Sequence, residues 1–154
     1  MDLDTGLRGS VDATVTVADT AVALGSGDVL VLGTPRVLAL VEAATVAAVA
    51  GALDPGATSV GSRVELEHRA PTPVGATVRA EAELTAVAGR RLTFTVTLTE
   101  AGRVVASGTV ERAVVDRTRF AASEPGPTSE PGPASEPGPT SEPGPAQAST
   151  EERG

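Results

Sequence analysis

Three polar side chains lie in otherwise apolar surroundings and have the chemistry to act on a carbonyl group. Glu42 is the only charged residue between Val37 and Ala50, His68 is the only histidine of the chain, and Thr34 precedes the apolar run. A carboxylate and an imidazole in an apolar pocket can activate water or attack an acyl carbon. Because a lone carboxylate is costly to bury unless it is paired or protonated, Glu42 needs a structural explanation first.

Residues 33–51 are predicted to form the helix that carries Thr34 and Glu42. Thr34 is a good N-cap, Pro35 suits the first helical position, and Gly51 is a plausible stop. The run is apolar nearly all the way round, which predicts a helix that is buried on every side. Thr34 and Glu42 are eight residues apart, about 12 Å along the axis, so a substrate could lie between them.

The start of this helix offers a second means of binding a substrate. The backbone amides of Arg36 and Val37 are expected to be free there, and they could polarise a carbonyl group or hold an oxyanion.

His68 ends a segment that alternates as a β-strand does, residues 60–68. Alternate residues of a strand share a face, so His68 is expected on the apolar side that meets the helix. Gly61 is expected on the other side. The residues predicted to share the face of His68 are Val60, Ser62, Val64 and Leu66.

The remaining segments predict an antiparallel sheet. Further strands are expected at residues 11–17, 77–87, 91–99 and 104–116, with Gly108 as a bulge or a point of close approach. The last four strands are joined by short turns, which join antiparallel neighbours. One sheet covered by one apolar helix is an α+β architecture, and its exposed edges favour a dimer. Residues 18–33 are interpreted as a loop on the core or a lid.

Composition narrows the classes of function. The 154 residues suggest one domain with a core of Val, Leu and Ala, because Phe94 and Phe120 are the only aromatic residues. Residues 1–122 hold 11 Arg and 14 acidic residues, a net charge of -3, and no basic patch in the sequence indicates a nucleic acid. No run is long enough to span a membrane, no signal peptide is evident, and the cytoplasm is the expected compartment.

Residues 123–154 differ from the rest of the chain. Tandem Ser-Glu-Pro-Gly-Pro repeats occupy most of this segment, and such a density of Pro and Gly cannot form a packed core. The expected organisation is therefore a folded domain at 1–122 followed by a disordered tail at 123–154.

Each candidate residue also has a purely structural interpretation. Thr34 could only cap the helix, His68 could be a satisfied core histidine, and Gly61 could serve close packing. Glu42 could pair with Arg36 or with a dimer partner. The sequence lacks the ligand spacing of a metal site, a glycine-rich phosphate loop and a GxSxG elbow.

Several of these pieces together resemble the hotdog-fold thioesterases of the fluoroacetyl-CoA thioesterase type. The resemblance covers roughly residues 11–120. It lies in Thr34-Pro35-Arg36 with Glu42 eight residues after Thr34, in Thr58-Ser59-Val60-Gly61, in His68 with the Ala70–Gly75 turn, and in the closing segment Gly108–Val115.

The resemblance implies a long central helix wrapped by a curved antiparallel sheet of about five strands, in a homodimer with sites at the interface. It implies that Thr34, Glu42 and His68 are catalytic and that Gly61 lies against the thioester carbonyl. Pro35 and Arg36 belong to the same motif and are expected to contact substrate. The implied reaction is hydrolysis of an acyl-CoA thioester, with no metal or organic cofactor apart from the CoA of the substrate.

Two departures from the family pattern bear on the substrate. Residues 18–33 have no aromatic residue, whereas the fluoroacetate-specific member has an aromatic-lined gate there. Val110 stands where the family often has a histidine. We therefore expect a short- or medium-chain acyl-CoA hydrolase rather than a fluoroacetyl-selective one. The alternatives are a non-catalytic acyl-CoA or acyl-carrier binding protein and a hotdog hydratase.

Overall fold

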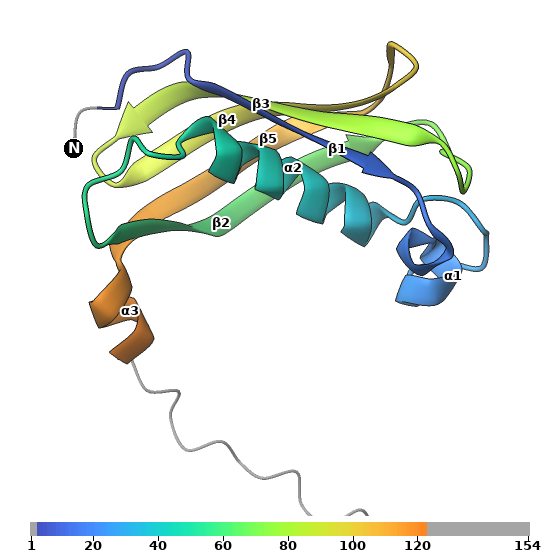
Figure 1. Ribbon diagram of the computed structural model, residues 1–154, viewed down its shortest axis with the longest axis horizontal. Coiled ribbons are helices and arrows are strands. Elements are labelled where there is room, and N and C mark those ends of the chain that lie inside the picture. The colour runs from blue at the N-terminus through green and yellow to red at the C-terminus, as the bar shows by residue number, and fades with distance from the viewer. Residues whose placement is uncertain (1–2, 123–154) are drawn as a thin grey trace, which may run out of the picture. The chain divides into compact units, whose positions relative to one another are not determined.

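A computed structural model describes residues 3–122, which form one five-stranded antiparallel sheet with a long helix lying across one of its faces (Figure 1). The strand order is β1-β3-β4-β5-β2, so β1 and β2 form the two edges. The strands are β1 Arg8–Thr14, β2 Ala57–His68, β3 Thr77–Ala88, β4 Arg91–Glu100 and β5 Arg103–Asp116. The predicted tail, 123–154, lies outside the described residues.

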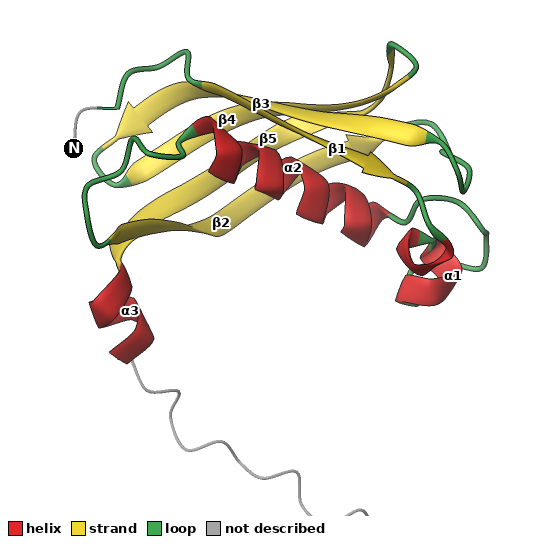
Figure 2. Ribbon diagram, viewed as in Figure 1, coloured by secondary structure: helices red, strands yellow, loops and turns green. Residues whose placement is uncertain are grey.

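The helices occupy distinct places on this sheet (Figure 2). The long helix α2, Thr34–Ala48, follows a short 3-10 helix at Val17–Asp19 and a four-residue helix α1 at Ala21–Leu24. The six-residue helix α3, Arg117–Ala122, continues from β5 at the other end of the sheet. None of the helices within residues 3–122 has the length and apolar character needed to cross a bilayer. The predicted α+β architecture of one helix on one antiparallel sheet is therefore confirmed.

The core lies between α2 and the sheet. Val37, Val41 and Ala44 of the helix are fully buried there against alternate residues of the strands. The four residues that alternation placed inward on β4 are all buried, as are four of the five predicted on β3. Phe94 is the one aromatic residue among them, and the rest are Val, Leu and Ala. The predicted core composition is thus confirmed.

Two register shifts reverse the expected faces of β2 and β3. On β2 the pairing with β5 shifts between Gly61 and Arg63, which leaves Ser62 as the extra residue. A one-residue bulge inverts the alternation, so Gly61 lies on the same face as His68 rather than on the opposite one. A similar shift between Leu84 and Ala86 leaves Ala86 exposed, although strict alternation placed it inward.

The helix is not buried on every side, as its composition predicted. Ala39, Ala43 and Val46 face away from the sheet and are exposed, with Val46 at 49%. A single sheet covers only one side of a helix. The apolar residues on the other side therefore remain uncovered in one copy of the chain, which bears on the predicted dimer below.

The segment between β1 and α2 lies on the core, as expected, and it also forms short helices. Leu32 is 2% exposed, and its amide donates to the carbonyl of Thr72 at 2.9 Å. Val29 and Leu30, in contrast, are 54% and 65% exposed. The segment is thus anchored at its end and presents aliphatic side chains to solvent before it enters α2.

Two glycines mark points where backbones meet closely. Gly9 of β1 lies so close to α2 that a Cβ atom would be 2.2 Å from the amide nitrogen of Ala48. A Cβ on Gly108 would be 1.9 Å from the carbonyl oxygen of Glu65, which makes Gly108 a point of close approach. The register of β2 and β5 is regular at Gly108, so the predicted bulge lies elsewhere.

We expect Gly9→Ala to lower the free energy of unfolding by at least about 2 kcal/mol, because β1 must move away from α2 to admit the methyl group. Gly27→Ala is the matched control, since its Cβ would make only an ordinary contact at 3.4 Å with Ala21. Urea unfolding measures both variants. Equal stability of the two would contradict the close packing of β1 on α2.

Candidate active site

Thr34 and His68 form the first polar group of the site. The hydroxyl oxygen of Thr34, in the first turn of α2, lies 2.9 Å from Nδ1 of His68 at the end of β2. The other ring nitrogen of His68, Nε2, is buried and has no hydrogen-bond partner within the described residues. The side chain of Thr34 therefore orients the imidazole, and Nε2 is the atom left to act on another molecule.

The expected capping role of Thr34 is wrong. Gly33 is the N-cap residue of α2, no side chain caps the helix, and Thr34 is the first helical residue. This places the Thr34 hydroxyl toward β2 rather than toward its own helix. Pro35 follows it and is exposed to solvent.

The amides that were expected to be free at the helix start are already bonded. Those of Arg36 and Val37 both donate to the carbonyl oxygen of Gly33, at 3.0 and 3.1 Å. The prediction that they hold an oxyanion is therefore wrong for this conformation, because the tight first turn uses both donors.

The Arg36 side chain is held by Asp19. Its Nε atom lies 3.0 Å from Oδ1 of Asp19, in the segment that precedes α2. Hydrogen bonds from Thr16, followed by the charge of Arg36, lower the pKa of Asp19. The pair fixes the entering segment to the helix start, and the predicted contact of Arg36 with substrate stays a prediction.

Glu42 belongs to a second polar group, centred on Arg112 of β5. Nη1 of Arg112 donates to Oε2 of Glu42 at 3.2 Å. Its Nε and Nη2 atoms donate to the hydroxyl and the carbonyl oxygen of Ser59 on β2, each at 2.9 Å. Arg112 is only 5% exposed, so these acceptors compensate for the loss of water around the guanidinium. Glu42 is paired with Arg112, not with Arg36.

Gly61 lies directly against Glu42. A Cβ atom at Gly61 would be 2.7 Å from Oε2 of Glu42 and 3.4 Å from Oε1. The absence of a side chain leaves room for the carboxylate between α2 and β2. The side chain of Glu42 remains 31% exposed, so its carboxylate can also meet a molecule from outside.

The two polar groups are distant from each other within one chain. Thr34 and Glu42 are eight residues apart on α2, which corresponds to about 12 Å. Gly61 and His68 are seven residues apart on β2, which corresponds to roughly 20 Å. Of the predicted residues, the structure brings together Thr34 with His68 and Glu42 with Gly61, but not one pair with the other.

A cavity of about 360 Å³ adjoins Thr34 and His68. One wall comes from the segment before α2, which includes Asp28, Val29 and Leu32, and another from Arg69–Pro71 after β2. Aliphatic and polar residues share this lining, and it contains no aromatic side chain. Residues 3–122 also contain no group of three or more His, Cys, Asp or Glu side chains arranged to hold a metal ion.

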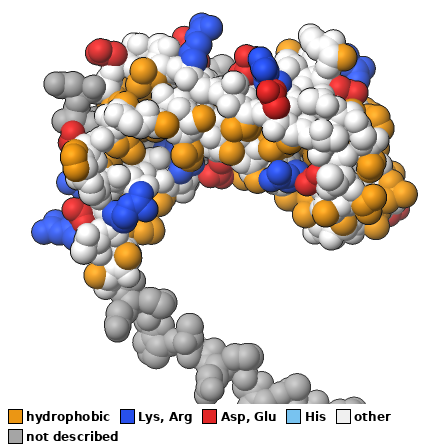
Figure 3. All heavy atoms as spheres, in the orientation of Figure 1, with side chains coloured by type: hydrophobic (Ala, Val, Ile, Leu, Met, Phe, Trp, Pro, Cys, Tyr) orange, Lys and Arg blue, Asp and Glu red, His pale blue; other side chains and the backbone are white. Residues whose placement is uncertain are grey.

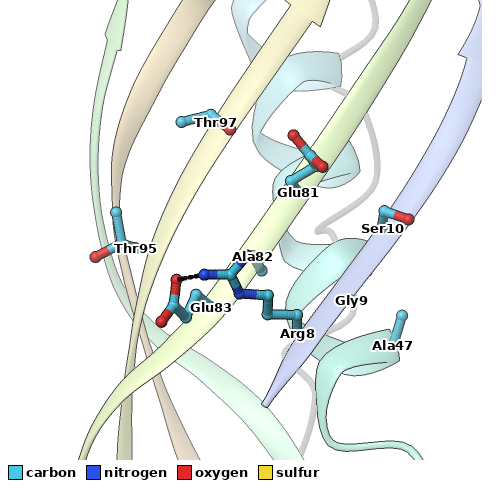
Figure 4. Close-up of a pocket in the computed structure, with 9 residues that line it drawn as sticks. All are labelled: Arg8, Gly9, Ser10, Ala47, Glu81, Ala82, Glu83, Thr95 and Thr97. Atoms are coloured by element: carbon cyan, nitrogen blue, oxygen red, sulfur yellow. Dashed lines mark ion pairs between the residues drawn. The ribbon is translucent and has the colours of Figure 1, made fainter. Parts of the chain in front are cut away.

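Another cavity, of about 530 Å³, lies over β1, β3 and β4 (Figure 4). Most of its side chains belong to the face of the sheet turned away from α2. Figure 4 shows the ion pair of Arg8 and Glu83 along it, at 3.0 Å. None of the predicted site residues lines this cavity, so it is separate from both polar groups.

The analysis of candidate residues did not give Arg112 a role, although its segment was part of the resemblance. A signal was present in the strand pattern. Val110 and Val114 are buried, and Arg112 lies between them at the same alternation. A charged residue on the apolar face of a strand must find a buried partner, and Glu42 is the one apolar-face acid of the facing helix.

Comparison with known proteins places this fold and these residues. A sequence model of the fluoroacetyl-CoA-specific thioesterase FlK family matches residues 15–118. The chain belongs to this thioesterase family. The fluoroacetyl-CoA thioesterase of Streptantibioticus cattleyicolor is 41% identical over 92 residues, which cover 60% of this chain and 66% of that protein.

Solved structures give the same result for the fold. A structure of the fluoroacetyl-CoA thioesterase FlK superimposes with a TM-score of 0.73 at 34% identity, over 79% of this chain and 95% of that one. A thioesterase superfamily member of Thermus thermophilus has the same TM-score at 22% identity, over 79% of this chain and 90% of that one. The fold is therefore the hotdog fold that the sequence predicted.

The ion pair of Arg112 and Glu42 should be measurable in a double-mutant cycle. We expect Arg112→Met alone to destabilise the protein by about 2 kcal/mol, because Glu42 and Ser59 lose their shared donor. Glu42→Gln should reduce the cost of the second change, with a coupling of about 1 kcal/mol. Urea unfolding of both single variants and the double variant gives the coupling. Strict additivity would show that the two side chains do not interact.

Proposed function

We propose that this protein is an acyl-CoA thioesterase, which hydrolyses a short- or medium-chain acyl-CoA to the free acid and CoA. The observation that carries the proposal is the carboxylate of Glu42, fixed by buried Arg112 and accessible beside the small residue Gly61. Membership of a thioesterase family supports it. An acyl-CoA or acyl-carrier binding protein would not need an acid held in this way together with an oriented imidazole.

In the proposed reaction Glu42 acts as a general base. One of its oxygens is held by Arg112, and the carboxylate accepts a proton from water as the water oxygen attacks the thioester carbonyl. The C–S bond then breaks, and His68 donates a proton to the departing thiolate while Thr34 keeps the ring in place. Gly61 gives the thioester room to approach the carboxylate. A nucleophilic attack by Glu42 itself, through an acyl-enzyme, is the alternative route.

The proposed acyl group is aliphatic. FlK has been crystallised with fluoroacetate and CoA, and its relatives are named for fluoroacetyl-CoA. In this chain the cavity beside His68 has Val29, Leu32 and other aliphatic residues but no aromatic one. Such a lining favours small saturated chains without selecting for fluorine. We also propose that no metal or organic cofactor takes part. The cytoplasmic location stays a prediction.

We further propose that the working unit is a homodimer whose site combines the two polar groups from different subunits. Figure 3 shows that the surface is hollowed beneath α2, between the ends that carry α1 and α3. Ala39, Ala43 and Val46 of α2 are exposed, and β2 is an edge strand, so each copy has an uncovered apolar face and an unpaired edge. Both features favour pairing with a second copy.

The spacing on β2 supports this arrangement. If two copies of β2 run antiparallel about an axis near Val64 and Glu65, Gly61 of one subunit lies beside His68 of the partner subunit. Both residues are on the face that carries α2, since the bulge at Ser62 turns Gly61 to that side. The axis would thereby bring the base and the acid to one thioester, which a single chain keeps apart.

Release of free thiol from acyl-CoAs of increasing chain length tests the reaction. We expect Glu42→Gln and His68→Ala each to lower kcat at least about 100-fold, because each removes a proton-transfer group. The dimer should remain intact, and EDTA should leave wild-type turnover unchanged. Binding of acyl-CoA without turnover by the wild type would instead identify a binding protein, and formation of an enoyl or hydroxyacyl product would identify a hydratase.

Mixed dimers test whether the site is shared between subunits. Glu42→Gln and His68→Ala subunits are denatured together and refolded as a mixture. We expect about one quarter of wild-type activity to return, because half of the dimers are mixed and each of these has one intact site out of two. A mixture as inactive as its components would mean that Glu42 and His68 act within one chain.

A further inference from the structure

The arginines of the domain are unevenly paired. Ion pairs with Asp or Glu engage Arg8, Arg36, Arg63, Arg69, Arg79, Arg103 and Arg112. Arg90 and Arg91, in the turn between β3 and β4, and Arg117, at the start of α3, form no ion pair within residues 3–122. These three and Arg119 lie at the same end of the sheet, and Figure 3 shows basic side chains gathered around α3.

Hydrogen bonds hold the segments of this end together. The amide of Arg117 donates to the carbonyl of Gly56 at 2.9 Å, and that of Val114 donates to the carbonyl of Arg90 at 2.8 Å. Oδ1 of Asp116 accepts from the amide of Arg119 at 2.8 Å and fixes the first turn of α3. The turn at Gly56, the turn at Arg90 and the helix α3 thus form one built surface.

Two adjoining cavities open on this surface. One, of about 200 Å³, is lined by Arg90, Arg119 and Phe120, with Val115 and Asp116. The other, of about 340 Å³, shares Arg90, Val115 and Asp116 and continues to Asp54 and Ala57 at the start of β2. Phe120 is 55% exposed, whereas Phe94 is fully buried. The exposed aromatic ring of the domain therefore lies in a cavity between two arginines.

The charge of this end is opposite to that of the domain. Four arginines face two acids, Asp54 and Asp116, although residues 1–122 are net negative. Arginines that surround an exposed aromatic ring suit a ligand with both phosphate groups and a flat base, because the guanidinium binds phosphate oxygens and the ring stacks on the base. The cavity at His68 differs, since its arginine, Arg69, is already paired with Glu67.

The two cavities are within reach of the proposed chemistry. Ala57 lines the second cavity and precedes Gly61 by four residues on β2, about 13 Å at the rise of a strand. An extended pantetheine arm covers a distance of this order between the thioester and the phosphates of CoA. We therefore propose that Arg90, Arg119 and Phe120 bind the phosphorylated adenosine end of the acyl-CoA. This inference rests on the proposed function and adds a nucleotide site to it.

Binding of two thiol-free or unacylated probes to the full chain tests the site. Calorimetry with CoA and with adenosine 3′,5′-bisphosphate should give dissociation constants about tenfold higher in Arg90→Ala and in Arg119→Ala, because each variant loses a charge-assisted bond to phosphate. Phe120→Ala should weaken both probes several-fold, and Phe120→Tyr should retain wild-type affinity because it keeps the ring. Unaltered affinity in the arginine variants overturns the proposal.

Arg63→Ala is the matched control. Arg63 has a 63% exposed side chain and pairs with Glu65 on β2, but it lines neither cavity. It should leave both affinities unchanged, and an equal loss there would show general electrostatics rather than a site.

Hydrolysis separates this inference from the proposed function. In Arg90→Ala we expect a higher KM for acyl-CoA, an unchanged kcat, and an unchanged KM for acyl-pantetheine, which lacks the nucleotide. Equal losses on both substrates overturn the nucleotide site while leaving the thioesterase in place. A wild type that hydrolyses neither substrate but binds the bisphosphate through Arg90 would refute the thioesterase and retain the nucleotide site.

Discussion

A buried arginine ties the central helix to the sheet. Arg112 of β5 reaches Glu42 on α2 and Ser59 on β2, so three elements meet at one guanidinium. A buried cation without these acceptors would be strongly unfavourable, and the pair therefore fixes the position of the Glu42 carboxylate. Stability and the proposed chemistry depend on the same contact: the group that would activate water is held by the interaction that joins helix to sheet.

The second constraint is the distance between the acid and the base of the proposed site. Thr34 and His68 lie at one end of the α2–β2 contact, whereas Glu42 and Gly61 lie further along it. A helix and a strand are rigid over this length, so a local movement does not bring the groups together. A second copy across the open edge of β2 would do so, which makes association a part of the proposed mechanism rather than an addition to it.

Electrostatics gives the domain a direction. Most arginines are neutralised by nearby acids, while those at the α3 end surround an exposed phenylalanine. The net negative charge of the chain hides this local excess, because charge is averaged over the sequence but acts over about 10 Å in solution. An anionic nucleotide would accordingly be drawn to one end of the sheet, with its acyl end pointing along β2.

The sequence by itself determined the order of the elements, the Val, Leu and Ala core, and the polar residues of the site, because periodicity and isolated charges are local signals. Strict alternation failed at Ser62 and Thr85, since a bulge depends on how two strands pair. Only the tertiary structure identified Gly33 rather than Thr34 as the cap and Arg112 as the partner of Glu42. Residues 70 positions apart in the chain meet through sheet pairing, which no local pattern encodes.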